Sequence, residues 1–383
     1  MKIGFDAKRA AQNRTGLGNY SRFVLRILSQ QHPEDEYHLY IPRRSRTQYL
    51  HEIPTLKAMR LHFPASGLWR RLASLWRVWG VTAGIRADGI GIFHGLSNEL
   101  PLNIRRAGCR TVVTIHDLIF IHCPEYYRLP DRIIYNYKFR RACRTADRVI
   151  AVSEYTKREI IKYYGTPAEK IDVVYQGCDP AFSAPVAEDT MAAVRARYGL
   201  PERFILYVGS IEERKNLMLV ARALDAMRSD GGTPCDDIHV VVAGRRTAYT
   251  GVIEAFLKEK GLEDRFHFHH SVPFDDLPPL YRMATAFVYP SRIEGFGIPL
   301  LEAVSGGVPA IGCTGSCLEE AGGPGCIYTD PDDEQAMAEA LRRVWTDGEL
   351  RQRMREQGLE HAKRFSDEAL CRDLRAVYDK VTG

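Results

Sequence analysis

The chain has 383 residues, more than one ordinary hydrophobic core accommodates, so we expect two domains. With 45% hydrophobic and 26% charged residues, its composition excludes a disordered or low-complexity protein. The net charge of +5 conceals a basic first part, because residues 1–183 contain 29 Lys and Arg against 16 Asp and Glu, whereas the rest contain 24 against 32.

The basic part predicts an anionic partner, and three classes of partner carry that charge: a membrane surface, a phosphate-bearing acceptor and nucleic acid. The sequence has no RNA- or DNA-recognition motif, so we expect no nucleic-acid partner. Its first residues, MKIGFDAKRA, lack the apolar core of a signal peptide, and no apolar run is long enough to cross a membrane. We therefore expect a cytoplasmic protein. The nine cysteines have no metal-ligand spacing, which predicts reduced thiols and no metal site.

Strand and helix patterns alternate from the start of the chain. An apolar run at 2–6 predicts the opening strand, and the loop TGLGNY follows it before a helix. Gly16 and Gly18 would let this loop bend tightly and present backbone amides to a phosphate, although a GxG pair alone often marks only a turn. Further apolar runs at 37–41 and 59–63 predict strands, and an α/β domain follows.

The segment LWRRLASLWRVWG at 68–80 predicts one amphipathic helix. Its apolar side chains fall near one face and its arginines fall among the other positions: Leu68, Leu72, Leu75, Trp76 and Trp79 against Arg70, Arg71 and Arg77. Two interpretations are open. The helix lies against anionic lipid, with arginines at the headgroups, or it packs on the core with solvated arginines.

Histidines stand near the ends of two further predicted strands, at 91–95 and 111–118. The carboxyl edge of an open parallel sheet is where ligands bind. We choose His116 as the functional histidine, able to donate to a substrate hydroxyl, with Asp117 able to accept from one. A satisfied core histidine is the competing interpretation for His94.

The rest of the first domain follows the same alternation, and Ser153 begins one of its helices. This serine either caps that helix or touches a ligand, and capping is the favoured role. The predicted elements are a helix at 130–146, strands at 148–153 and 171–177, a helix at 154–164, and a proline-containing connection at 178–186. The first domain is therefore placed at 1–183.

The second domain opens with a strand at 203–210 that runs directly into IEERKNL. Arg214 and Lys215 therefore stand at the ligand end of a buried strand, where they would neutralise a diphosphate. A solvated helix start is the alternative. Runs at 238–244 and 265–270 predict further strands of a second doubly wound sheet.

The most informative stretch is FVYPSRIEGFGIPLLEAVSGGV at 287–308, which joins a strand to a helix. Its glycines let backbone approach a ligand, and the helix start offers amides to an anion. Glu294 and Glu302 would accept hydrogen bonds from different hydroxyls of one ligand, such as a sugar and a ribose. A capped helix with a solvated glutamate is the competing interpretation. The second domain is placed at 184–365, and a closing helix at 366–383 is expected to pack back on the first domain.

Several motifs fall in order along nearly the whole chain: TGLGNY, TIHD, VSEYTK, VGSIEERKNL, PSRIEGFGIPLLEA and GVPAIG. Together they resemble those of retaining glycosyltransferases of family 4, and the ERKN form resembles that of bacterial polysaccharide mannosyltransferases. The resemblance implies a GT-B fold, in which two Rossmann-like, doubly wound α/β domains face each other across a cleft. It also implies a nucleotide-sugar donor held mainly by the C-terminal domain, and chemistry without a metal or other cofactor.

The resemblance assigns roles to residues that match the family's motifs. It implies that Glu302 binds the nucleotide ribose, that Glu294 binds donor-sugar hydroxyls, and that Lys215 binds the diphosphate. His116 would lie near the reacting carbon. Many members have an arginine where this chain has Ser210, and Arg214 is expected to supply the missing charge; Glu320 stands in for the acid of a common PE pair. The other donor contacts implied are Gly16 and Gly18 from the first domain, and Phe296, Gly297 and Ile298 from the second.

The function implied is transfer of a hexose, with retention, to a glycan or lipid-linked glycan of a cell-surface polysaccharide. GDP-mannose is the expected donor, and a UDP-hexose is the alternative. A nucleotide-sugar epimerase of the same fold and a protein that only binds sugar nucleotides also stay open. We further expect peripheral contact between the basic first domain and the inner face of the membrane.

Overall fold

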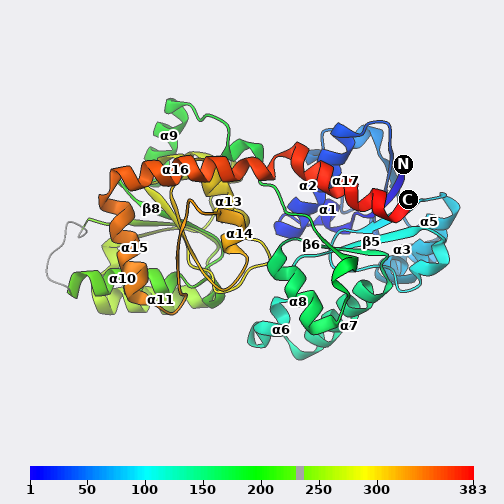
Figure 1. Cartoon of the computed structure of the whole chain (residues 1–383), viewed down its shortest axis with the longest axis horizontal. Coiled ribbons are helices and arrows are strands. Elements are labelled where there is room, and N and C mark those ends of the chain that lie inside the picture. The colour runs from blue at the N-terminus through cyan, green and yellow to red at the C-terminus, as the bar shows by residue number, and fades with distance from the viewer. Residues whose placement is uncertain (230–236) are drawn as a thin grey trace. The chain divides into compact units, whose positions relative to one another are not determined.

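The computed structural model describes residues 1–229 and 237–383, and these form two compact units (Figure 1). The first unit contains Met1–Gly177 and Phe365–Gly383, and the second contains Cys178–Arg364. The chain thus leaves the first unit at Gly177, rather than at residue 183, and returns to it at Phe365.

Unit 1 is built on a seven-stranded sheet in which every pair of neighbouring strands is parallel. Apart from the edge strands β3 and β7, its strands are largely buried, as expected for a parallel sheet with helices on both faces. The order reverses between β1 and β4, which makes their carboxyl ends a topological switch point. In spatial order the strands are β3 (Arg60–His62), β2 (Glu36–Tyr40), β1 (Lys2–Asp6), β4 (Ile92–Gly95), β5 (Arg110–Ile115), β6 (Arg148–Ala151) and β7 (Ile171–Val173).

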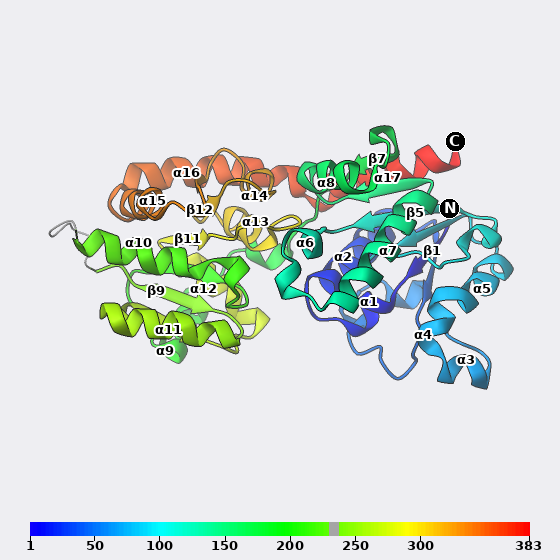
Figure 2. The ribbon, with the colours of Figure 1, turned by 90° about the horizontal axis from the view of Figure 1, so that it is seen from below.

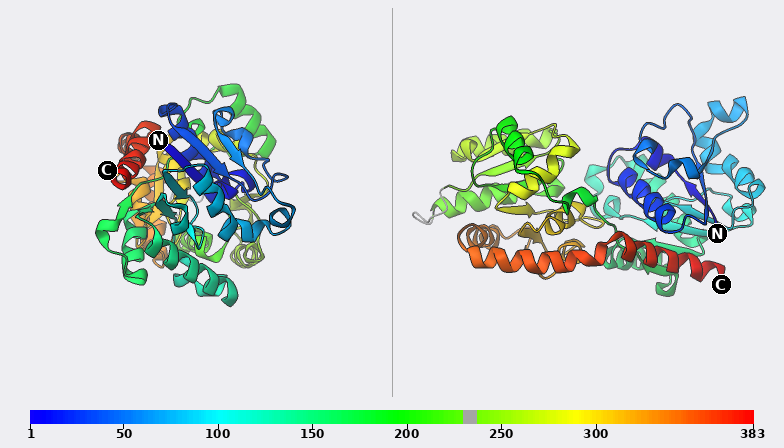
Figure 3. Two further views of the ribbon diagram at one scale, coloured as in Figure 1. Left: turned by 90° about the vertical axis from the view of Figure 1, so that its right-hand side faces the viewer. Right: turned by 90° about the horizontal axis from the view of Figure 1, so that it is seen from above.

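The helices of unit 1 include the last helix of the chain, α17 (Asp367–Thr382), which contacts α2 and β5 (Figure 3). Arg26 of α2 donates from Nη2 to Oδ1 of Asp367 at 3.0 Å, and the fully buried Tyr378 hydroxyl lies 2.7 Å from Nδ1 of His94. His94 is therefore a satisfied core histidine. The other helices are α1 (Lys8–Gln12), α2 (Gly16–Gln31), α3 (Gly67–Arg71), α4 (Ala73–Leu75), α5 (Val81–Ala87), α6 (Ile119–His122), α7 (Leu129–Thr145) and α8 (Glu154–Tyr164).

The prediction of one continuous helix over 68–80 is wrong. The α-helical backbone is interrupted at Leu72, and a π-helical turn, η3 (Trp76–Gly80), connects α4 to α5. Arg77 does not face solvent, because its Nε donates to Oδ2 of Asp6 at 2.7 Å and its Nη1 to Oε2 of Glu99 at 2.9 Å. A helical period cannot foresee this inward turn, since the two carboxylates come from distant parts of the chain.

Unit 2 contains a six-stranded parallel sheet whose order reverses between β8 and β11. The strands in spatial order are β10 (Phe266–His269), β9 (Val240–Ala243), β8 (Ile205–Val208), β11 (Ala286–Tyr289), β12 (Ala310–Cys313) and β13 (Ile327–Thr329). The helices are α9 (Glu188–Tyr198), α10 (Leu217–Ser229), α11 (Ala248–Lys260), α12 (Leu277–Met283), α13 (Ile298–Ser305), α14 (Leu318–Gly322), α15 (Glu334–Thr346) and α16 (Gly348–Ala362). Two parallel, doubly wound sheets confirm the predicted α/β class.

None of the helices within 1–229 and 237–383 combines the length and the apolar character needed to cross a lipid bilayer.

Candidate active site

A cluster of charged side chains gathers at the switch point of unit 2, where β8 and β11 end. The chain leaves β8 through Gly209 and forms a short helical turn, η8 (Glu213–Lys215), which is closed by the left-handed Asn216 (φ 58°). The loop after β11 brings Glu294 to the same place. In open α/β sheets the switch point is where ligands bind, so the topology alone selects this cluster.

Glu294 receives several hydrogen bonds, all on one oxygen. Its Oε1 accepts from Nζ of Lys215 at 2.5 Å, from Nη1 of Arg214 at 3.0 Å, from the Ser291 hydroxyl at 2.6 Å and from the Tyr289 hydroxyl at 3.2 Å. Within the described part of the chain, Oε2 of Glu294 accepts no hydrogen bond. This oxygen is therefore available to a ligand hydroxyl, while Oε1 fixes the orientation of the carboxylate.

The cluster is electrostatically matched. Burial opposes ionisation of Glu294, but the charges of Lys215 and Arg214 outweigh it and lower its pKa to about 2. Burial and the neighbouring Arg214 guanidinium lower the pKa of Lys215, while Glu294 opposes that shift. We take the pair to be ionic at neutral pH. Lys215 also donates to the Tyr289 hydroxyl, so two of its three ammonium protons are engaged and the third can meet an anion.

Glu302 lies on α13 in a different environment. Its Oε2 accepts a hydrogen bond from the Tyr281 hydroxyl at 2.9 Å. Burial raises its pKa to about 7, against the lowering effect of that hydrogen bond. Glu294 is thus a permanent anion, whereas Glu302 changes its charge near neutral pH.

The segment from Phe296 to Ile298 turns the chain from the loop into α13. Gly297 has a left-handed backbone (φ 103°), and a Cβ there would come within 2.6 Å of the Leu318 side chain, so only glycine fits. Ser210 follows β8, and its carbonyl accepts a hydrogen bond from the Tyr207 hydroxyl at 3.1 Å. Glu320 lies separately on α14, where its carbonyl is 3.0 Å from Nε2 of His361.

His116 follows β5 in unit 1, and its hydrogen bonds correct one expectation. Nε2 lies 2.9 Å from the carbonyl oxygen of Leu96, so this nitrogen carries the proton and donates it there. Burial lowers the pKa of His116 to about 4. The ring is neutral at pH 7, and its Nδ1 lone pair faces the Nε2 amide nitrogen of Gln176 at 3.5 Å, which donates to it. His116 therefore has no proton left to donate to a substrate hydroxyl.

The other residues predicted in unit 1 are mostly engaged in local structure. Asp117 accepts the Ile119 amide at 3.1 Å at the start of α6, and the fully buried Ser153 accepts the Thr156 amide at 3.0 Å as the cap of α8. Gly16 and Gly18 lie in the first turn of α2 rather than in a loop. The structure therefore groups Ser210, Arg214, Lys215, Glu294, Phe296, Gly297, Ile298 and Glu302 in unit 2, and Gly16, Gly18, His116, Asp117 and Ser153 in unit 1.

Three hydroxyl side chains in the site were missed by the sequence interpretation. Tyr289 and Ser291 stand inside the informative stretch, and the end of a parallel strand is a signal that could have identified them. Tyr281, which donates to Glu302, lies 21 residues earlier on α12 and gave no signal.

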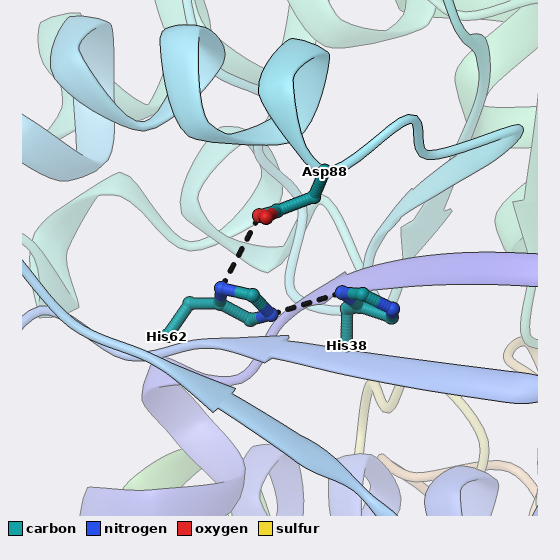
Figure 4. Close-up of side chains that lie close together, drawn as sticks. All are labelled: His38, His62 and Asp88. Atoms are coloured by element: carbon teal, nitrogen blue, oxygen red, sulfur yellow. Dashed lines mark hydrogen bonds and ion pairs between the residues drawn. The ribbon is translucent and has the colours of Figure 1, made fainter.

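One group of side chains in the described residues has the composition of a metal site: His38, His62 and Asp88 in unit 1 (Figure 4). Nδ1 of His62 faces Oδ2 of Asp88 at 3.2 Å, and its Nε2 faces Nδ1 of His38 at 2.9 Å. Both ring nitrogens of His62 thus have partners. The three side chains thus form a hydrogen-bonded chain, and the Tyr40 hydroxyl donates a further hydrogen bond to Asp88 at 2.7 Å.

Family models match both units. Residues 20–182 match the model described as Glycosyltransferase Family 4, and residues 193–361 match Glycosyl transferases group 1. O-antigen chain mannosyltransferase B of Escherichia coli is 29% identical over 96% of each chain. A D-inositol 3-phosphate glycosyltransferase of Salinispora tropica is 32% identical, but over 62% of this chain and 51% of that protein.

Solved structures share the fold over the full length. HepE of Anabaena, crystallised with UDP and glucose, has a TM-score of 0.75 at 17% identity. The match covers 99% of this chain and 100% of HepE. WaaG, a glycosyltransferase of lipopolysaccharide biosynthesis, has a TM-score of 0.67 at 17% identity, with both chains fully covered. The motifs, the two parallel-sheet units and these matches agree: the chain belongs to family 4 of the glycosyltransferases, has the GT-B fold and is a hexosyltransferase.

Proposed function

We propose that this enzyme transfers mannose from GDP-mannose, with retention of configuration, to a glycan or lipid-linked glycan during synthesis of a cell-surface polysaccharide. The observation that carries the proposal is the Lys215–Arg214–Glu294 cluster at the β8/β11 switch point, which offers two cations to a diphosphate and one free carboxylate oxygen to a sugar hydroxyl. The identity with an O-antigen mannosyltransferase over 96% of the chain supports the sugar and the pathway class.

The protein's part in the proposed reaction is electrostatic. Negative charge grows on the diphosphate as the glycosidic bond breaks, and Lys215, Arg214 and the first amides of α13 stabilise it. The departing diphosphate then accepts the proton of the acceptor hydroxyl, which attacks from the same face. Glu294, with a pKa of about 2, is too weak a base for that proton, so it serves to hold donor-sugar hydroxyls.

Glu302 completes the donor site in this proposal by accepting hydrogen bonds from the ribose hydroxyls. Tyr281 holds one oxygen of its carboxylate and leaves the other for the nucleotide. The family resemblance also assigns His116 to the donor sugar, and Gly16 and Gly18 to the diphosphate. No residue is assigned as a covalent nucleophile, and no metal or other cofactor takes part.

A UDP-hexose is the second candidate donor, and a thermal-shift screen of GDP-, UDP- and ADP-sugars separates the two. A ligand that binds only the folded protein raises the melting temperature according to its affinity. We expect GDP-mannose to give the largest shift. A larger shift with a UDP-hexose would transfer the proposal to that donor, and no shift with any sugar nucleotide would refute it.

Two further activities remain alternatives. An epimerase would interconvert a UDP-sugar without any acceptor, and a binding protein would hold the donor without turnover against any acceptor. Both are tested by incubating the enzyme with the donor, with and without a lipid-linked glycan, and analysing the sugars released or transferred. We expect transfer only when acceptor is present.

We also propose that the enzyme works at an anionic membrane surface through its basic unit 1. That unit contains 32 Lys and Arg against 19 Asp and Glu. Such attraction is screened by salt, so binding to anionic liposomes should weaken as ionic strength rises. Failure to bind at low salt would refute this part of the proposal.

A further inference from the structure

Helices α3 and α4 lie at the margin of unit 1 (Figure 2). A row of exposed apolar side chains follows these helices and continues into η3. Leu68, Leu72, Leu75 and Trp79 are 65%, 40%, 42% and 44% exposed. The segment nevertheless has a buried side, which includes Trp76 and the ion-paired Arg77. These four residues, the first stripe, therefore form an outward apolar edge that the unit itself does not cover.

Helix α7 carries a second exposed row. Leu129, Ile133 and Tyr137 are 63%, 61% and 57% exposed. Their spacing of four continues to Arg141, and Arg144 follows three positions later, so one face of the helix changes from apolar to basic along its length. The opposite face is anchored on the core of the unit by Phe139, Ala142 and Cys143. We call Leu129, Ile133 and Tyr137 the second stripe.

The two stripes lead to one arginine-lined cavity of about 560 Å³. Trp79 ends the first stripe and lines this cavity, and the basic end of α7 lines it from another side. The full lining is Trp79, Leu102, Asn103, Arg105, Arg106, Arg141, Arg144 and Thr145. Four guanidinium groups thus share a cavity whose lining contains no carboxylate.

Acidic side chains do little to neutralise these arginines, and hydrogen bonds hold the backbone around the cavity in place. Across residues 1–229 and 237–383, Arg105, Arg106 and Arg144 have no ion pair with an acidic side chain, while Arg141 donates to the Leu102 carbonyl at 2.6 Å. The Leu102 amide donates to the Val78 carbonyl at 2.8 Å, and Nδ2 of Asn103 to the Trp79 carbonyl at 3.1 Å. These bonds hold the short helical turn η4 (Ile104–Ala107) beside η3 before any ligand arrives.

An anionic phospholipid matches this combination. A guanidinium group can donate two parallel hydrogen bonds to one phosphate. Exposed Leu, Ile, Tyr and Trp side chains are removed from water when they enter the boundary between headgroups and acyl chains, which favours binding. A soluble phosphate would satisfy the arginines and leave both stripes in water. We propose that the cavity is a binding site for the phosphate headgroup of an anionic phospholipid, and that the two stripes enter the membrane interface around it. This inference rests on the proposed membrane contact of unit 1 and gives that contact a site.

Vesicle binding with matched charge variants tests the site. Arg106→Gln/Arg144→Gln removes two charges from the cavity, and Arg353→Gln/Arg372→Gln removes two exposed charges elsewhere, so both variants have the same net charge. With vesicles of phosphatidylcholine and phosphatidylglycerol (3:1), we expect the cavity variant to bind about 30-fold more weakly than wild type, and the control to bind within about threefold of it. Equal losses in the two variants would overturn the site, as would no loss in the cavity variant.

The apolar stripes have their own test. Leu72→Ser/Leu75→Ser should lower affinity for the same vesicles, whereas Leu359→Ser, an equally exposed leucine of unit 2, should not. In the wild-type protein, Trp fluorescence should shift to shorter wavelength on binding, and Trp79→Phe should remove most of that shift. Wild-type affinity in the Leu72/Leu75 variant would overturn the interfacial insertion. Full competition by millimolar inorganic phosphate would assign the cavity to a soluble anion instead.

GDP-mannose binding, measured by calorimetry without vesicles, separates this inference from the proposed function. The cavity variant should bind the donor like wild type. Failure of vesicle binding with donor binding intact would refute the lipid site alone, and failure of donor binding with vesicle binding intact would refute the proposed donor.

Discussion

Two glutamates of the same enzyme have opposite electrostatic properties because their neighbours differ. Glu294 faces Lys215 and Arg214, which outweigh its burial and hold its pKa at about 2. Glu302 is partly buried beside a neutral tyrosine hydroxyl, and desolvation raises its pKa to about 7. The sequence predicted that both acids would serve one ligand, but not their different charge states, since those depend on partners distant in the chain.

Replacing Glu294 by Gln should both weaken transfer and destabilise unit 2. The substitution leaves two buried cations without their anion, and breaking such a pair costs roughly 3 kcal/mol. Because the folded pKa lies below the ordinary value of 4.5, the stability that Glu294 contributes is present above about pH 4.5 and is lost as the pH falls toward 2. Urea denaturation at pH 7 and pH 3 measures both effects; an equal loss of stability at the two pH values would contradict this explanation.

The raised pKa of Glu302 predicts the opposite dependence of folding stability on pH. Its folded pKa is raised, so the folded state binds the proton more tightly and stability falls as the pH rises from about 4.5 to about 7. Glu302→Gln should therefore increase the free energy of unfolding by about 1 to 3 kcal/mol at pH 8 and change it little at pH 4. In the wild-type enzyme, donor affinity should fall below about pH 7, where the carboxylate is protonated. Donor affinity that is constant between pH 5.5 and 8 would exclude Glu302 from binding the ribose.

At the scale of elements, strand and helix positions were largely predictable, and the failures have local causes. The strand predicted at the start of the stretch 287–308 falls on β11, and the helix predicted at 154–164 coincides with α8. A buried parallel strand and a capped amphipathic helix leave clear patterns in the sequence. The prediction of one helix at 68–80 failed because Arg77 forms ion pairs with Asp6 and Glu99, which are distant in the sequence, instead of facing solvent. The prediction that His116 donates to a substrate was wrong because its proton goes to the Leu96 carbonyl. This acceptor is a backbone atom and has no sequence signature.

The first turn of α2 offers a matched pair of glycines. A Cβ on Gly18 would lie 1.8 Å from the Asn13 carbonyl oxygen, whereas a Cβ on Gly16 would meet no atom within 4 Å. Gly18→Ala should therefore destabilise the protein by about 1 to 3 kcal/mol through overpacking, and Gly16→Ala should leave stability equal or slightly higher. Thermal unfolding of the two variants checks this, and equal stabilities would contradict it. If Gly16 approaches the diphosphate as predicted, its variant should lose donor affinity without losing stability.

At the scale of the whole molecule, the fold class was predictable because apolar runs in the sequence indicate the buried strands of each sheet. The motifs also fall in order along the chain. In unit 2, reversal of the strand order between β8 and β11 explains why Lys215 and Glu294, 79 residues apart, share one hydrogen bond. The donor sugar is set by side-chain contacts that these motifs do not specify, so it remains a proposal.

Removal of metal ions tests the expected independence from cofactors. The proposed reaction uses Lys215, Arg214 and backbone amides to stabilise the diphosphate, so treatment with EDTA should leave the rate of transfer unchanged within about twofold. A loss that is restored by Mg²⁺ or Mn²⁺ would show that a cation takes part in the reaction.

The most direct measurement of the central claim is the rate of mannose transfer from GDP-mannose by Lys215→Ala. Removing a charge that stabilises the leaving diphosphate should lower kcat by about 10²- to 10³-fold. Thermal unfolding of the variant provides the control that it remains folded. Lys215→Arg, which retains the charge, should recover part of the rate. A folded Lys215→Ala enzyme that transfers mannose within a few fold of the wild-type rate would contradict the account.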